Sequence, residues 1–221
     1  MAIVARTATV SELASSQSIS GTIPSGAANG DLLIVTFGLS ASPATLTAPD
    51  SSWLPLFSPF LITSTVDRTL AVYYQYVTNI GSVVAPAVST TIAAGRQTAI
   101  VQAYTGVDPG HPFDVIGTAQ GINGSTTLVL TSVTTVTGNT MLVSGCVVDA
   151  ATAATITVPS GMNQAGMSTG VGRVTGYAEE ARPTAGATGT RTWTESSTLA
   201  MGGYLAAIKP ASAAAGAWFH I

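Results

Sequence analysis

The chain has 221 residues and a formal net charge of −3, and 8% of its residues are charged, against roughly 25% in typical globular domains. A net acidic chain without a clustered basic face excludes nucleic acid as a partner, and no run approaches the ~20 apolar residues of a membrane helix, so no membrane insertion is expected. So few charges give little protection against association, which predicts a homo-oligomer or larger assembly.

Strand signals recur along the chain at the spacing of sandwiches and barrels, and no segment sustains a helical period of 3.6 residues. Alternation places Val72, Tyr74 and Tyr76 on one face of a strand. An all-β protein is therefore expected. In chain order the expected strands are 2–10, 17–23, 31–39, 44–48, 68–78, 97–105, 126–136, 140–149, 154–158, 171–180 and 198–209.

Two blocks of the sequence repeat. Residues 30–35, Gly-Asp-Leu-Leu-Ile-Val, are echoed by residues 138–143, Gly-Asn-Thr-Met-Leu-Val. A Thr-rich stretch ending at proline follows each, at 45–49 and at 155–159. The repeat predicts a jelly-roll-like β-sandwich with two similar halves, whose strands interleave into two facing sheets within a single domain, residues 1–210.

Residues 211–217 form a small-residue linker, and the chain then carries the apolar side chains Trp218, Phe219 and Ile221. Such side chains prefer not to remain in water. They are expected either to fold back onto their own sandwich or to dock on a neighbouring subunit. In the second case they are the oligomer contact, and a trimer is the expected state.

Chemistry-bearing residues are sparse. His111 clusters with Asp108 and Asp114, but Asp, Pro and Gly there are typical of a turn, in which the carboxylates accept local backbone N–H bonds. Glu179 and Glu180 are adjacent, so on a strand they face opposite sides. We expect no catalytic, metal or cofactor residues and no enzyme activity, and Cys146, the sole cysteine, is expected to be a buried, inert thiol.

Carbohydrate binding is a separate possibility. Trp53, Trp193 and Tyr73 offer stacking surfaces for a glycan, with Arg191 and Arg68 nearby in sequence as polar partners. The alternative explanation is that these rings fill the core.

Several motifs resemble virion structural proteins of tailed bacteriophages of actinobacteria. The motifs are residues 30–35, Ala-Pro-Asp-Ser-Ser-Trp at 48–53, Arg-Thr-Leu-Ala-Val-Tyr-Tyr at 68–74, Ala-Tyr-Thr-Gly-Val-Asp at 103–108, Pro-Phe-Asp at 112–114, and Leu-Ala-Ala-Ile-Lys-Pro at 205–210. The resemblance implies a non-enzymatic β-sandwich, assembled in the host cytoplasm, that oligomerises and packs on other virion proteins. A minor tail or tail-tip component is the first expectation, a head decoration protein the alternative, and a module that binds host cell-surface glycan the second alternative.

Overall fold

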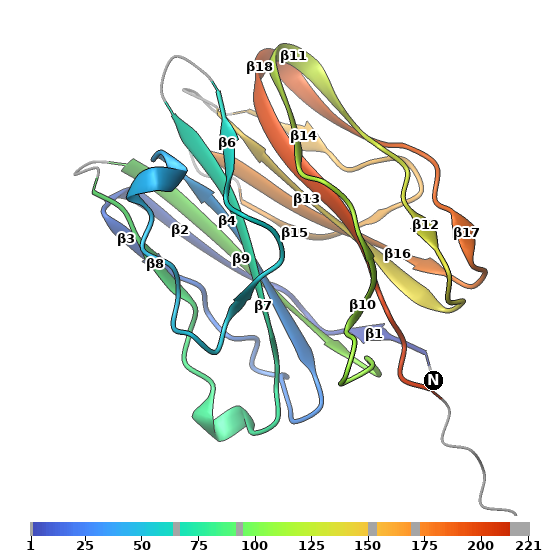
Figure 1. Cartoon of the computed structure of the whole chain (residues 1–221). Helices are drawn as coiled ribbons and strands as arrows, with labels where there is room; N and C mark the ends of the chain where they lie inside the picture. The colour runs from blue at the N-terminus through green and yellow to red at the C-terminus, as the bar shows by residue number, and fades with distance from the viewer. Residues whose placement is uncertain (1, 64–66, 92–94, 150–153, 169–172, 213–221) are drawn as a thin grey trace, which may run out of the picture.

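The computed structural model describes residues 2–63, 67–91, 95–149, 154–168 and 173–212. This part of the chain is all-β, as predicted, and its only helical segments are two short 3₁₀ turns, η1 (Pro43–Thr45) and η2 (Ile80–Ser82). The strands form two large antiparallel sheets and two small ribbons (Figure 1). Neither in length nor in hydropathy does any helical segment of the described residues match a membrane span.

The first half of the chain builds the first sheet. Its central strand β4 lies between β7 and β9, β1 and β2 pair with the outer side of β9, and β5 and β6 pair with the outer side of β7. A ribbon of β3 and β8 completes this half. The strands are β1 (Val4–Ala5), β2 (Thr9–Ser16), β3 (Ser18–Ser20), β4 (Leu32–Leu39), β5 (Leu54–Pro55), β6 (Phe60–Ile62), β7 (Arg68–Tyr76), β8 (Ala87–Ser89) and β9 (Gly95–Thr105).

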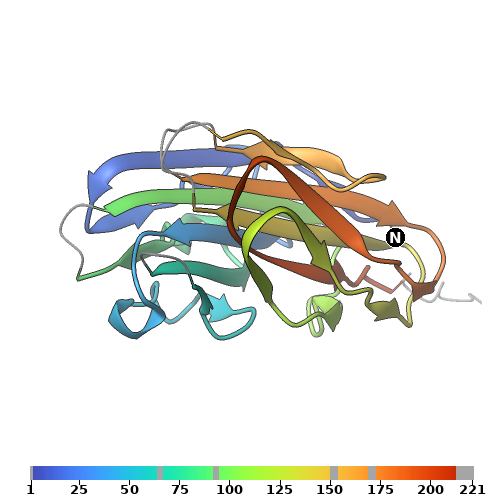
Figure 2. The same cartoon turned by 90° about the horizontal axis from the view of Figure 1, so that it is seen from above.

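The second half repeats this plan. The central strand β13 lies between β16 and β18, β10 and β11 pair with β18, β15 pairs with β16, and β12 forms a ribbon with β17. β11 and β18 curve together across one side of the molecule (Figure 2). The strands are β10 (Phe113–Ile116), β11 (Gln120–Leu130), β12 (Thr134–Thr135), β13 (Thr140–Val148), β14 (Ile156–Thr157), β15 (Asn163–Met167), β16 (Val174–Arg182), β17 (Gly186–Ala187) and β18 (Arg191–Ile208).

The two similar halves are therefore present, but the expected interleaving of their strands is wrong. Each half supplies one complete sheet, and the two sheets pack on each other. The physical reason lies in the connections: each central strand finds both neighbours within its own half, so no strand needs to cross to the other sheet. The fold is a β-sandwich without the strand exchange of a jelly roll.

The structural repeat is shifted by one residue from the sequence repeat. Gly30 and Asn139 both have a left-handed backbone, with φ of 87° and 57°. Their amides donate equivalent hydrogen bonds, from Gly30 N to Val77 O (2.7 Å) and from Asn139 N to Pro183 O (3.0 Å). Gly30 therefore corresponds to Asn139 and not to Gly138, because the turn fixes which face each following side chain occupies.

With Gly30 aligned to Asn139, equivalent residues of β4 and β13 point to the same side of their sheets. Alternate residues of β4 and β13 pack either between the two sheets or against the chain segments that cover the outer face of each sheet, which we call the outer cover. Both strands are therefore buried along their whole length. The core between the sheets includes Leu32, Ile34, Leu70, Val72, Met141, Val143, Val147 and Tyr177. The outer core of the first half includes Leu33, Val35, Phe37, Trp53 and Tyr73, and that of the second half includes Leu142, Cys146, Val148, Met162 and Trp193.

The predicted long strands are confirmed to within a few residues for β4, β7, β9 and β13. The predicted strand 44–48 is wrong, since η1 occupies its start and Thr47 makes only an isolated bridge to Ser89. The predicted strand 198–209 begins earlier, at Arg191, because β18 continues alongside β11.

Candidate functional site

The three aromatic residues predicted to contact glycan are core residues, so that prediction is wrong. Trp193 is fully buried, Trp53 is 3% exposed and Tyr73 is 4% exposed. The indole nitrogens are also occupied: Trp53 Nε1 donates to Val84 O (2.9 Å), and Trp193 Nε1 donates to Ser144 Oγ (2.8 Å). A ring with no exposed face cannot stack on a sugar, and these side chains instead anchor the outer covers of the two halves.

Trp218, Phe219 and Ile221, the predicted oligomer contacts, lie outside the described residues. The structure does show where this segment departs. Pro210 forms a bridge with Val107, and Ala211 N donates to Gly106 O (2.8 Å). The described chain is therefore held to the sandwich as far as Ala211.

The turn around His111 is structural, as predicted. Asp108 Oδ1 accepts hydrogen bonds from the amides of Gly110 (2.9 Å) and His111 (3.2 Å), and Lys209 Nζ lies 3.1 Å from Asp108 Oδ2. The Lys209 contact and these amides lower the pKa of Asp108. Within the described ranges, no group of three or more His, Cys, Asp or Glu residues could hold a metal ion.

Buried hydroxyl groups join the two sheets. Thr36 Oγ1 lies 3.0 Å from Tyr204 Oη, and Thr98 Oγ1 lies 2.6 Å from Thr175 Oγ1. These contacts satisfy polar groups that would otherwise be costly between two apolar faces. They are enclosed in the core, so their role is to fix how the sheets stack.

The adjacent acids face opposite sides, as predicted. Glu179 points toward the first sheet, where Tyr104 Oη donates to its Oε2 (2.7 Å), and Tyr104 Oη lies 3.2 Å from Tyr177 Oη. Glu180 instead pairs with Arg191 (2.5 Å) and Arg182 (3.2 Å). Burial raises the pKa of Glu179 above its ordinary value, while the bond from Tyr104 partly opposes that rise.

Replacing Glu179 with glutamine should stabilise the protein at neutral pH. Because the folded-state pKa is raised, the protonated acid contributes stability at low pH, and that contribution is lost as pH rises through the folded pKa. Glutamine keeps an acceptor for Tyr104 without the charge. Thermal denaturation from pH 4 to 8 should show the gain above the ordinary range of a glutamate and none at pH 4; an equal gain at both ends would contradict the assignment.

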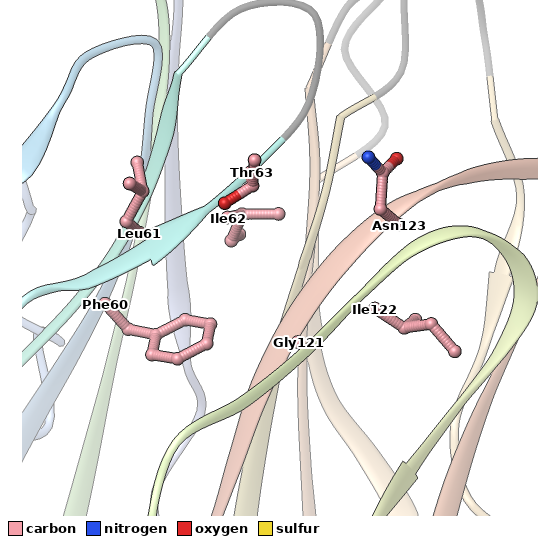
Figure 3. Close-up of a pocket in the computed structure, with 7 residues that line it drawn as sticks. All are labelled: Phe60, Leu61, Ile62, Thr63, Gly121, Ile122 and Asn123. Atoms are coloured by element: carbon pink, nitrogen blue, oxygen red, sulfur yellow. The ribbon is translucent and has the colours of Figure 1, made fainter.

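An uncharged hollow of about 250 Å³ lies where the edges of the two sheets meet, and we call it the β6–β11 cleft. Its lining residues are Phe60, Leu61, Ile62, Thr63, Gly121, Ile122 and Asn123 (Figure 3). The lining contains no charged group. Leu61 and Ile122 are 39% and 41% exposed, so large apolar side chains at this margin remain in contact with water.

Glycines let β6 approach the β11–β18 ribbon at this cleft. A Cβ atom on Gly121 would lie 2.8 Å from the Phe60 ring, and one on Gly202 would lie 2.5 Å from Ile62. Gly121 and Gly202 are direct partners across the ribbon. No sequence pattern indicates the cleft, because the apolar run around Phe60 does not reveal which side chains remain exposed at a sheet edge.

Comparison of the chain with protein-family models, with curated proteins and with solved structures gave no match.

Proposed function

We propose that the protein is a structural subunit of a tailed-bacteriophage particle, a minor tail or tail-tip component that associates with copies of itself. The observation that carries the self-association is the β6–β11 cleft, an uncharged hollow with exposed Leu61 and Ile122 at its margin. The resemblance of residues 30–35, 68–74 and 103–108 to virion proteins supports the placement in a particle.

The occupant of the cleft is the C-terminal segment, residues 213–221, of a neighbouring copy. Trp218, Phe219 and Ile221 have the apolar character that the cleft lining matches. Full burial of a large apolar side chain contributes about 1.5–3 kcal/mol, which gives two or three such side chains enough to support a specific contact.

The position of the departing chain favours a neighbour over the same molecule. Gly202 lies at the cleft, and Ala211 follows nine residues later at the far end of an extended strand, about 30 Å away. Trp218 is seven residues beyond Ala211, and even a fully stretched chain spans at most about 25 Å over that length. Trp218 therefore falls short of its own cleft, whereas the cleft of a second copy can lie within its reach.

This contact also fits a closed ring. One subunit gives its C-terminal segment and the next gives its cleft, so the interface is heterologous, and such interfaces generate rings when the rotation between subunits closes. Two subunits that exchange segments reciprocally would close as a dimer, and three that pass the segment around a ring would close as the expected trimer; in either case closure makes each contact support the others.

Ending the chain after Ser212 should convert the oligomer to a monomer without unfolding the sandwich, because the strands of both sheets and the cores they bury are built from residues up to Ile208. Light scattering on the full chain should give a multiple of 22.1 kDa, and the shortened chain should give one copy. The melting temperature at low concentration should be the same for both. An oligomer unchanged in mass after the deletion would refute the role of the segment.

Placement in a particle needs a separate test. Immunogold labelling of particles released from cells that carry the gene should mark the tail tip in few copies. Labelling over the whole head would favour the head decoration alternative, and intact particles without the protein would contradict a virion role.

A further inference from the structure

Arg173 carries a buried guanidinium immediately before β16, with 2% of the residue exposed. Its Nη2 donates to Ser40 Oγ (2.6 Å), and its Nη1 lies 3.8 Å from Asp149 Oδ1, beyond hydrogen-bond distance. In the described part of the chain, Nε and Nη1 have no hydrogen-bond partner. A buried charged donor left in this state is costly, and such groups are normally satisfied by a partner, water or an ion.

The Arg173 side chain lines a cleft of about 280 Å³, which we call the Arg173 cleft. The other lining residues come from β2 and β9, and they are Glu12, Leu13, Ala14, Arg96, Gln97 and Thr98. The size is at the lower end of the range for small-ligand sites. The cleft thus lies directly against a guanidinium that has two nitrogens without a hydrogen-bond partner.

Positive charge dominates around Arg173. Arg68 and Arg96 act on it electrostatically, and Asp149 is the carboxylate that opposes them. Asp149 is engaged more closely elsewhere, since Arg68 Nε lies 2.6 Å from its Oδ1. Burial and the neighbouring Arg68 lower the pKa of Arg173 to about 9, so the guanidinium is still charged at neutral pH. Asp149 balances only part of the positive charge of the three arginines.

We propose that the Arg173 cleft binds a small oxyanion, of which phosphate is the type, between the Arg173 and Arg96 side chains. An oxyanion offers several acceptor oxygens to donors that approach from different directions, which suits two guanidinium groups on different strands. The water-poor setting of Arg173 strengthens the interaction. Glu12 at the cleft wall limits the affinity, so binding in the millimolar range is expected.

The test uses the full chain and inorganic phosphate. At pH 7, phosphate at about ten times its dissociation constant should raise the melting temperature by about 3–5 °C more than sodium chloride of equal ionic strength. Arg173→Met should lose this phosphate-specific rise, and Arg96→Gln should weaken binding about two- to fivefold. Arg191→Met, which alters an arginine paired with Glu180 away from the cleft, should retain the full rise.

A second measurement covers the case in which Arg173→Met does not fold. In the unaltered protein, the nuclear magnetic resonance signal of the Arg173 Nε–H group should shift with phosphate and saturate, and chloride should not move it. An equal effect of phosphate and chloride, or a phosphate-specific rise that survives in Arg173→Met, would overturn the proposal. Neither result bears on self-association, because the Arg173 cleft and the β6–β11 cleft share no residue.

Discussion

Replacing Trp193 with alanine should lower the free energy of unfolding by about 3–5 kcal/mol, the cost of removing a large aromatic ring from a close-packed core. Trp193 is fully buried and lies over Gly176, where a Cβ atom would come within 2.7 Å of the ring. The glycine leaves no side chain that could move into the space. The substitution also removes the Nε1 bond to Ser144, which then leaves a buried hydroxyl with one partner fewer.

Urea denaturation followed by circular dichroism measures this loss. Val136→Ala is the control, because Val136 is 81% exposed and its truncation should change stability by less than about 0.5 kcal/mol. A loss below about 1 kcal/mol for Trp193→Ala would mean that the ring does not hold the outer cover of the second half in place.

Replacing Ile122 with aspartate should weaken self-association about 100-fold or more. The substitution places a carboxylate at the margin of a cleft whose lining has no charged side chain, so incoming apolar side chains that cover this margin would have to desolvate it without a partner. Ile122 is 41% exposed in the single chain, so the melting temperature of the dilute protein should change little. Sedimentation equilibrium over a range of concentrations gives the association constant.

The matched control is Val129→Asp, on the same strand and 52% exposed, but outside the cleft. It adds the same charge and should leave association unchanged apart from the small effect of net charge. Equal weakening by both substitutions would indicate general charge repulsion, and no weakening by Ile122→Asp would exclude the cleft as the contact.

The sequence predicted where the central strands lie in the chain, but it did not predict which strands pair with them. β4 and β13 were predictable because a strand buried on both faces is a continuous apolar run, as residues 32–35 show. Which strands join the same sheet depends on the connections, and an apolar pattern does not encode them. The interleaved arrangement was wrong for this reason.

The site residues were hard to predict for the same reason: their roles depend on contacts between segments that are distant in the chain. An aromatic side chain such as Trp53 or Trp193 is suited both to stacking on a sugar and to filling a core, and only the strands packed around it decide between the two. Arg173 had no sequence signal, because its burial arises from Ser40 and Asp149, which are distant in the chain. The β6–β11 cleft likewise depends on residues distant in the chain, since Gly121 and Gly202 leave the space into which Phe60 and Ile62 pack.

The most direct test of the assembly places one cysteine in the cleft and one in the C-terminal segment, on different chains. Cys146 is buried and burial raises the pKa of its thiol, so it should not compete. When Ile122→Cys and Phe219→Cys chains are mixed and oxidised, mass spectrometry should detect a disulfide between residues 122 and 219 of different chains. A yield no higher than that from Val129→Cys mixed with Phe219→Cys would contradict assembly through the cleft.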